Sequence, residues 1–326
     1  LSPDYFPAPG AAWERLAPGA AGFDPAGLKA AVDYALANET GWPTSISDYY
    51  LKELKEPPPL NEILGPMRDR GGPAGLVLRG GRIVAEWGDG DRADMTFSAT
   101  KSYLSACVGL AFDRGLIADL DAPVRGLVDD GGFEPPHNDR ITWTHLLQQT
   151  SEWEGTLWDK PDMIDRNRQV GAASDGGAES AKGEFRALAA PGRFWEYNDV
   201  RVNRLALAAL RVLREPLPKL LKAAIMDPIG ASDTWEWHGY RNSWVEIAGT
   251  RMQSVSGGAH WGGGMFISAR DHARFGHLFL RRGRWRDRQL ISEGWVERAL
   301  TPCAINPHYG FMWWLNSDGN GIGCKR

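Results

Sequence analysis

The residues best suited to chemistry in this sequence are Ser98 and Lys101, in the run Ser98-Ala-Thr-Lys101. A free serine hydroxyl is a poor nucleophile and needs a nearby base. Residues three apart lie on one face of a helix, so the amine of Lys101 can reach Ser98 Oγ. Burial beside other donors would lower the pKa of Lys101, so that it could accept the serine proton. The spacing therefore indicates nucleophilic catalysis at Ser98.

The Ser-x-x-Lys pattern is short, and chance alone gives on the order of half a match in such a chain. The context favours the catalytic interpretation, because the pattern opens a helix and directly follows a hairpin signal. At a helix N-terminus, free backbone N–H groups and the helix dipole would also stabilise a developing oxyanion.

A second group with catalytic potential is Tyr197-Asn198-Asp199, just before a helical stretch. A tyrosine relays protons when a cation lowers its pKa, or donates a proton to a leaving group. The alternative is structural: Tyr197 packs, and Asp199 caps the helix that starts at Val200.

The glycine-rich run SGGAHWGGGMFISARDHARFG is a third candidate. Glycines bring the backbone close to a ligand or a neighbouring strand. His260 and Trp261 are therefore candidates for the wall of a cleft. The alternative is a tight entry into a strand, with His260 an ordinary polar residue.

The elements that must position these residues are strands at both chain ends and helices in the middle. Gly80-Gly81 between two apolar runs predicts a hairpin, and the stretch after it predicts a long helix from about Phe97. Further helices are expected after Asp24, Thr142 or Thr144, Asp199 and Ser268, and YGFMWWL at 309–315 reads as a strand. We expect an α+β sandwich, with a sheet flanked by helices from residues 1–115 and 251–326 and a mainly helical domain at 116–250.

The composition is that of a globular protein, with 43% hydrophobic and 24% charged residues and a net charge of -4. This charge predicts no nucleic-acid partner, and no segment is apolar enough for a transmembrane helix. The three cysteines, Cys107, Cys303 and Cys324, form no disulfide framework. The histidines show no metal spacing, so we expect no metal. Fifteen tryptophans suggest an aromatic-lined cleft, although core packing explains most of them.

The three candidate segments, taken together and in this order, resemble the serine β-lactamase and penicillin-binding-protein superfamily. The likeness runs from about residue 73 to 315 and is greatest to the class C-like branch, which includes esterases, D-amino-acid peptidases and oligomer-amide hydrolases. The resemblance implies an antiparallel sheet beside a helical domain, with the cleft between them. It also implies that Ser98 is the nucleophile, Lys101 the base and Tyr197 the residue that protonates the leaving group.

Two departures from the family pattern affect the expected activity. The family's Tyr-x-Asn motif falls on Tyr197 and Asp199, so a carboxylate stands where the family has an amide. It cannot donate an N–H to substrate, and we expect it to disfavour acidic substrates. The family's third motif, Lys-Thr-Gly or His-x-Gly, is not found: Gly321-Ile322-Gly323 does not match it, and His260 comes too early. Either the sequence stops short of that strand, or the hydrolase is incomplete.

The expected reaction is acyl transfer through a covalent ester on Ser98, with no cofactor. We expect the substrate to be a small carboxylic ester or amide. A β-lactamase or D,D-peptidase is the alternative within enzymes, and a catalytically silent ligand-binding protein is the alternative outside them. The sequence leaves the oligomeric state open. It also leaves the compartment open, because a leader could have been removed before Leu1.

Overall fold

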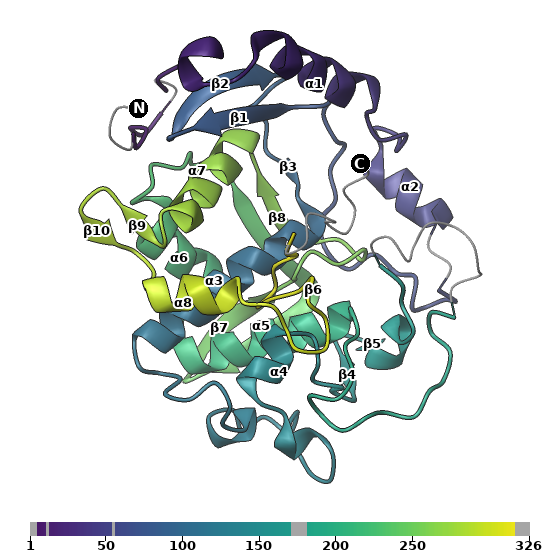
Figure 1. Cartoon of the computed structure of the whole chain (residues 1–326). Coiled ribbons are helices and arrows are strands. Elements are labelled where there is room, and N and C mark those ends of the chain that lie inside the picture. The colour runs from purple at the N-terminus through teal and green to yellow at the C-terminus, as the bar shows by residue number, and fades with distance from the viewer. Residues whose placement is uncertain (1–4, 11–12, 54–55, 171–180, 317–326) are drawn as a thin grey trace.

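The computed structural model describes residues 5–10, 13–53, 56–170 and 181–316 (Figure 1). Gly321-Ile322-Gly323 and Cys324 lie outside these residues. The α-helices are α1 (Pro25–Ala37), α2 (Ile46–Glu53), α3 (Thr100–Asp113), α4 (Trp143–Leu147), α5 (Asp199–Leu213), α6 (Leu217–Leu221), α7 (Ala269–Leu280) and α8 (Glu293–Ala299). The strands are β1 (Gly75–Arg79), β2 (Arg82–Trp87), β3 (Asp94–Met95), β4 (Thr156–Leu157), β5 (Lys160–Pro161), β6 (Glu236–Ile247), β7 (Thr250–Val255), β8 (Gly264–Ile267), β9 (Arg284–Trp285) and β10 (Arg288–Gln289).

The largest sheet in the described part of the chain is antiparallel, with the strand order β3-β8-β6-β7. In its register Met95 faces Phe266, and Trp237 faces Met265. Strand β3 comes from the N-terminal part of the chain and β8 from the C-terminal part. The expected α+β class, with a sheet built from distant segments, is confirmed.

The predicted hairpin is formed by β1 and β2, which pair in antiparallel register. Its turn is made by Gly80 and Gly81, whose φ angles of 57° and 86° are open to glycine at no steric cost. Figure 1 shows the hairpin at the top of the molecule, between α1 and α7.

Helices α3 and α5 form the centre of the core. Every residue from Tyr103 to Ala111 in α3 is buried, as is every residue from Asp199 to Leu210 in α5. Helix α3 packs against α5, α6 and α8, so it is covered on several sides and not on a single apolar stripe. Cys107 is completely buried in this core, as expected.

Most of the predicted helix starts are confirmed by their caps. Asp24 caps α1 with Pro25 in the first helical position, Thr142 caps α4, and Ser268 accepts a hydrogen bond from the backbone of Asp271 at the start of α7. The Asp271 side chain turns instead to Ser232, where its Oδ2 accepts a 2.6 Å hydrogen bond.

Three segments differ from the sequence-based expectation. Strand β6 lies inside the range 116–250, which was expected to be mainly helical. Helix α2 forms within residues 41–74, where the sequence pattern predicts mostly irregular chain. The run 309–315 is not a strand: it has a single bridge between Tyr309 and Trp314. Met312 adopts a φ of 62°, which interrupts an extended backbone.

Candidate active site

Ser98 lies in a tight turn that is held against the sheet. It belongs to a single 3-10 turn, Phe97–Ala99, between β3 and α3. The Thr96 amide donates to the Met265 carbonyl at 2.9 Å, and the Met265 amide donates to Thr100 Oγ1 at 3.1 Å. Phe97 has a φ of 44°, an uncommon value for a bulky residue. The turn therefore presents Ser98 at the start of α3, as the sequence predicted.

The amine of Lys101 is surrounded by three oxygen atoms. Its Nζ lies 2.9 Å from Ser98 Oγ and 3.2 Å from the Gly257 carbonyl oxygen. It also forms a 2.7 Å ion pair with Asp199 Oδ1. The side chain is only 1% exposed, so these three contacts replace its hydration.

Asp199 is the partner of Lys101 and does not cap α5. The cap is Asn198, whose side chain accepts from the backbone of Val200 and Arg201, and Asp199 is the first helical residue. The expectation that Asp199 caps the helix is therefore wrong. The side chain of Asp199 is free to pair with Lys101 because Asn198 already satisfies the helix N-terminus.

The second oxygen of Asp199 is also paired. Asp199 Oδ2 lies 2.7 Å from Arg168 and 3.7 Å from His260 Nδ1. Because two cations balance this carboxylate and its side chain is 2% exposed, its charge reaches the surroundings weakly. The basis for expecting it to repel acidic substrates is thereby removed.

The pKa of Lys101 is raised, contrary to the expectation from sequence. Burial alone would lower this pKa, but the Asp199 carboxylate and Tyr197 together outweigh burial and favour the ammonium form. The local sequence around Lys101 indicates only hydrogen-bond donors near the amine. It could not identify the acidic partner, which comes from a distant helix.

Tyr197 is held beside the amine of Lys101 by aromatic packing. Lys101 Nζ lies 5.0 Å from the centre of the Tyr197 ring, and the Arg168 guanidinium carbon lies 5.4 Å from it. Trp314 stacks on the ring at 5.4 Å, and Tyr309 meets it edge-on at 6.1 Å. Segments far apart in sequence thus bring Ser98, Lys101 and Tyr197 together.

The two candidates from the glycine-rich run, His260 and Trp261, lie in different surroundings. His260 Nε2 lies 3.0 Å from Glu56 Oε1, and its ring faces Asp199, so it belongs to the surroundings of the site. Trp261 is completely buried, and Lys160 lies over its ring at 5.2 Å. The expectation that Trp261 lines a cleft is wrong, because its indole is part of the core.

Sequence reasoning missed several residues that surround the site. Arg168 pairs with Asp199, and Glu56 pairs with both His260 and Lys182. The Tyr50 hydroxyl on α2 is close enough to Asp199 for the carboxylate, together with burial, to raise the tyrosine pKa. No local pattern marks these residues, since each comes from a loop or helix far from the motifs in sequence.

A buried charge network supports the segment that carries Tyr197. Arg201 on α5 forms ion pairs with Glu152 at 2.7 Å and with Asp162 at 3.1 Å. The Asn198 side chain donates to the Asp162 carbonyl at 2.8 Å, and the backbone N–H of Asn198 donates to Gln149 Oε1 at 3.0 Å. Buried ionic groups that are paired and hydrogen-bonded hold a backbone in one arrangement.

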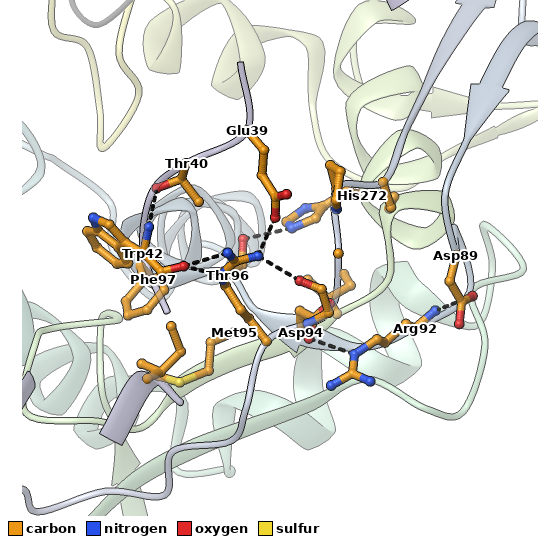
Figure 2. A pocket seen from close by; sticks show the side chains of 18 residues that line it. Glu39, Thr40, Trp42, Asp89, Arg92, Asp94, Met95, Thr96, Phe97 and His272 are labelled. Carbon is orange, nitrogen blue, oxygen red and sulfur yellow. Dashed lines mark hydrogen bonds and ion pairs between the residues drawn. The ribbon is translucent and has the colours of Figure 1, made fainter. Parts of the chain in front are cut away.

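A separate pocket of about 520 Å³ adjoins the turn that carries Ser98 (Figure 2). Thr96 and Phe97 line it, but Ser98, Lys101 and Tyr197 do not. Thr96 Oγ1 lies 2.7 Å from His272 Nε2, and burial lowers the pKa of His272 to about 4. The pocket therefore lies beside the turn and apart from these three side chains.

Within the described residues, no group of three or more His, Cys, Asp or Glu side chains is arranged to hold a metal ion. Over the same residues, no helix is long and apolar enough to cross a membrane.

Comparison with solved structures identifies similar folds at low sequence identity. A protein described as a beta-lactamase from Bacteroides dorei is 17% identical with a TM-score of 0.51, over 72% of this chain and 70% of that one. A protein described as a 6-aminohexanoate-dimer hydrolase from Bacillus anthracis is 18% identical with a TM-score of 0.52, over 74% and 65%. EstCE1, a hydrolase with promiscuous acyltransferase activity, is 15% identical with a TM-score of 0.50, over 89% and 85%.

These likenesses confirm the β-lactamase/transpeptidase-like α+β fold. A search of curated proteins finds no match. The family model described as Beta-lactamase matches residues 60–323, which include Ser98, Lys101 and Tyr197. Since this match extends over most of the sequence, the chain belongs to the Beta-lactamase family.

Proposed function

We propose that this protein is a serine hydrolase that forms a covalent acyl-enzyme on Ser98 and acts on a small carboxylic ester or amide. The observation that carries the proposal is the 2.9 Å contact between Lys101 Nζ and Ser98 Oγ, in a turn clamped to β8. Family membership supports the reaction type, because most members of the family are serine hydrolases.

In the proposed reaction, Ser98 Oγ forms a bond to the substrate carbonyl carbon and gives its proton to the neutral amine of Lys101. The bond from that carbon to the leaving oxygen or nitrogen breaks, and Tyr197 protonates the leaving group. Tyr197 regains a proton from Lys101. Water then attacks the ester on Ser98, which releases the acid and restores the serine hydroxyl.

The preference for a neutral ester or amide is supported by the balanced charges around Ser98. Lys101 and Arg168 pair with the carboxylate of Asp199. Asp165 pairs with both Arg168 and Lys182, and Glu56 pairs with Lys182. Three cations therefore face three carboxylates, which leaves no strong excess charge of one sign. The structures with a similar fold include a protein described as a 6-aminohexanoate-dimer hydrolase and a hydrolase with promiscuous acyltransferase activity. A β-lactamase or D,D-peptidase is the alternative substrate class, and comparing penicillin with a neutral ester distinguishes the two.

A second candidate is a catalytically silent binding protein. It is favoured by the ion pair with Asp199, because an ammonium Lys101 cannot accept the proton of Ser98. A protein of this kind would bind a ligand in the cleft without forming the covalent ester.

Labelling with a fluorophosphonate probe separates the two candidates. We expect the probe to add to Ser98, as mapped by peptide mass spectrometry, and we expect Ser98→Ala to remain unlabelled. Lys101→Met keeps most of the side-chain volume and should slow labelling by about a hundredfold to ten-thousandfold. A folded wild-type protein labelled elsewhere, or not at all, would refute the acyl-enzyme proposal.

A further inference from the structure

The acid-base state of Lys101 depends on a residue outside the Ser-x-x-Lys pattern. Lys101 has three oxygen neighbours within 3.2 Å: Ser98 Oγ, the Gly257 carbonyl oxygen and Asp199 Oδ1. An ammonium group has three N–H donors and no acceptor, so this arrangement matches the charged form of lysine. A neutral amine would instead donate to Asp199 and Gly257 and accept the hydroxyl proton of Ser98, so the two forms differ in the direction of the hydrogen bond to Ser98.

The carboxylate of Asp199 is fixed so that it keeps facing the amine. Arg168 binds its other oxygen at 2.7 Å, and the backbone amide of Asp199 donates to Asp165 Oδ2 at 2.9 Å. Burial alone would raise the pKa of Asp199, but Lys101 and Arg168 hold it well below its usual range. The acid thus stays ionised and keeps a negative charge 2.7 Å from Lys101 Nζ.

We propose that Asp199 is a positioning residue that sets the pH range in which Ser98 is acylated, by holding Lys101 as an ammonium ion. This rests on the proposed function, in which the neutral amine of Lys101 takes the serine proton. Acylation of Ser98 then requires Lys101 to lose a proton against the attraction of Asp199. The rate of Ser98 acylation therefore increases as the pH rises.

Other titratable or charged groups face this pair from every side. They are Tyr50 on α2, Asp165 and Arg168 from the segment before α5, Tyr197 at the entrance to α5, and His260 from the glycine-rich stretch. Arg168 opposes Asp199, since its positive charge disfavours the ammonium form of Lys101. Removing the charge of Asp199 should therefore lower the pKa of Lys101, and removing the charge of Arg168 should raise it.

The experiment measures the rate of fluorophosphonate labelling of Ser98 from pH 6 to 9.5 by intact-protein mass spectrometry. For the wild-type protein we expect a rise of about tenfold per pH unit, the slope that loss of one proton produces. Asp199→Asn keeps the size of the side chain and removes its charge. We expect its rising limb to move down by at least about one pH unit, and its labelling at pH 7 to be at least about tenfold faster.

Arg168→Met tests the same inference with the opposite sign and remains informative if Asp199→Asn fails to fold. Without the guanidinium, Asp199 attracts Lys101 more strongly, so the limb should move to higher pH and labelling at pH 7 should slow. Far-ultraviolet circular dichroism of each variant verifies the fold.

Asp130→Asn is the matched control for loss of a buried carboxylate. Asp130 pairs with Arg204 and Arg211, away from Lys101, so its removal should cost stability without moving the pH profile. If wild type and Asp199→Asn label Ser98 with coincident pH profiles, the inference is overturned and the proposed function stands. A folded Asp199→Asn that is never labelled also overturns it, because Asp199 would then be required as a proton acceptor. A wild-type protein unlabelled at every pH overturns both.

Discussion

At the scale of single residues, the site is defined by which charges meet at one amine. Helical spacing brings Lys101 to Ser98, and the contact of 2.9 Å follows from local geometry. The partner that determines its charge, Asp199, arrives from the first turn of α5. The reactivity of the pair therefore depends on a contact between two helices more than on the spacing within one.

Tyr197→Phe tests the proton-transfer role of the tyrosine hydroxyl. The ring should keep its stacking on Trp314, because only the hydroxyl is removed. We expect turnover of a neutral p-nitrophenyl ester to fall by about a hundredfold, the lower end of the usual effect of a general acid. The measurement is steady-state kinetics together with thermal unfolding. Unchanged kinetics would show that Tyr197 acts through packing alone.

At the scale of elements, the turn between β3 and α3 depends on how closely the glycine-rich segment approaches it. Gly258 has a φ of 83°, and a Cβ at this position would overlap the carbonyl oxygen of Phe97. The turn that presents Ser98 thus requires both a left-handed backbone and the absence of a side chain at Gly258.

Gly258→Ala should therefore destabilise the protein and displace Ser98. A non-glycine residue at positive φ costs about 1–3 kcal/mol, and the overlap with Phe97 adds to this. The free energy of unfolding measured in urea and the rate of fluorophosphonate labelling should both be lower than in the wild-type protein.

The control for this prediction is Gly276→Ala in α7, where a Cβ would meet nothing within 4 Å. Replacing a helical glycine by alanine at an open site should raise stability by about 0.5–1 kcal/mol. Equal stability and labelling in Gly258→Ala and wild type would contradict the steric argument.

At the scale of the whole molecule, unfolding should respond to pH through His272. Its Nε2 lies 2.7 Å from Thr96 Oγ1 and its Nδ1 lies 2.8 Å from the Tyr103 hydroxyl, so it joins α7 to the turn after β3 and to α3. Burial lowers its pKa to about 4 from an ordinary value of 6.5. Between these two values the unfolded chain binds a proton that the folded protein does not.

Folding stability should therefore be complete above about pH 6.5 and decline as the pH falls towards 4, by at most about 3 kcal/mol from this group. Burial lowers the pKa of His145 as well, so it adds in the same direction. The free energy of unfolding, measured in urea from pH 7.5 down to 4, should decline less steeply for His272→Gln than for the wild-type protein. Parallel curves for the two proteins would show that His272 does not titrate on unfolding.

Features that depend on neighbours along the chain could be predicted from the sequence alone. The hairpin at Gly80-Gly81, the caps Asp24 and Ser268, and the approach of Lys101 to Ser98 all follow from turn and helix geometry. The order of the motifs was enough to predict the family and the fold class.

Which distant groups face one another depends on tertiary packing, and the predictions that involved such groups were wrong. Asn198 caps α5 and leaves Asp199 to pair with Lys101, and Trp261 lies in the core. A pKa depends on burial and on charges within a few ångströms, whatever their separation in sequence. The local pattern thus predicted the contact between Ser98 and Lys101, while the charge on that lysine depends on the packing of α3 against α5.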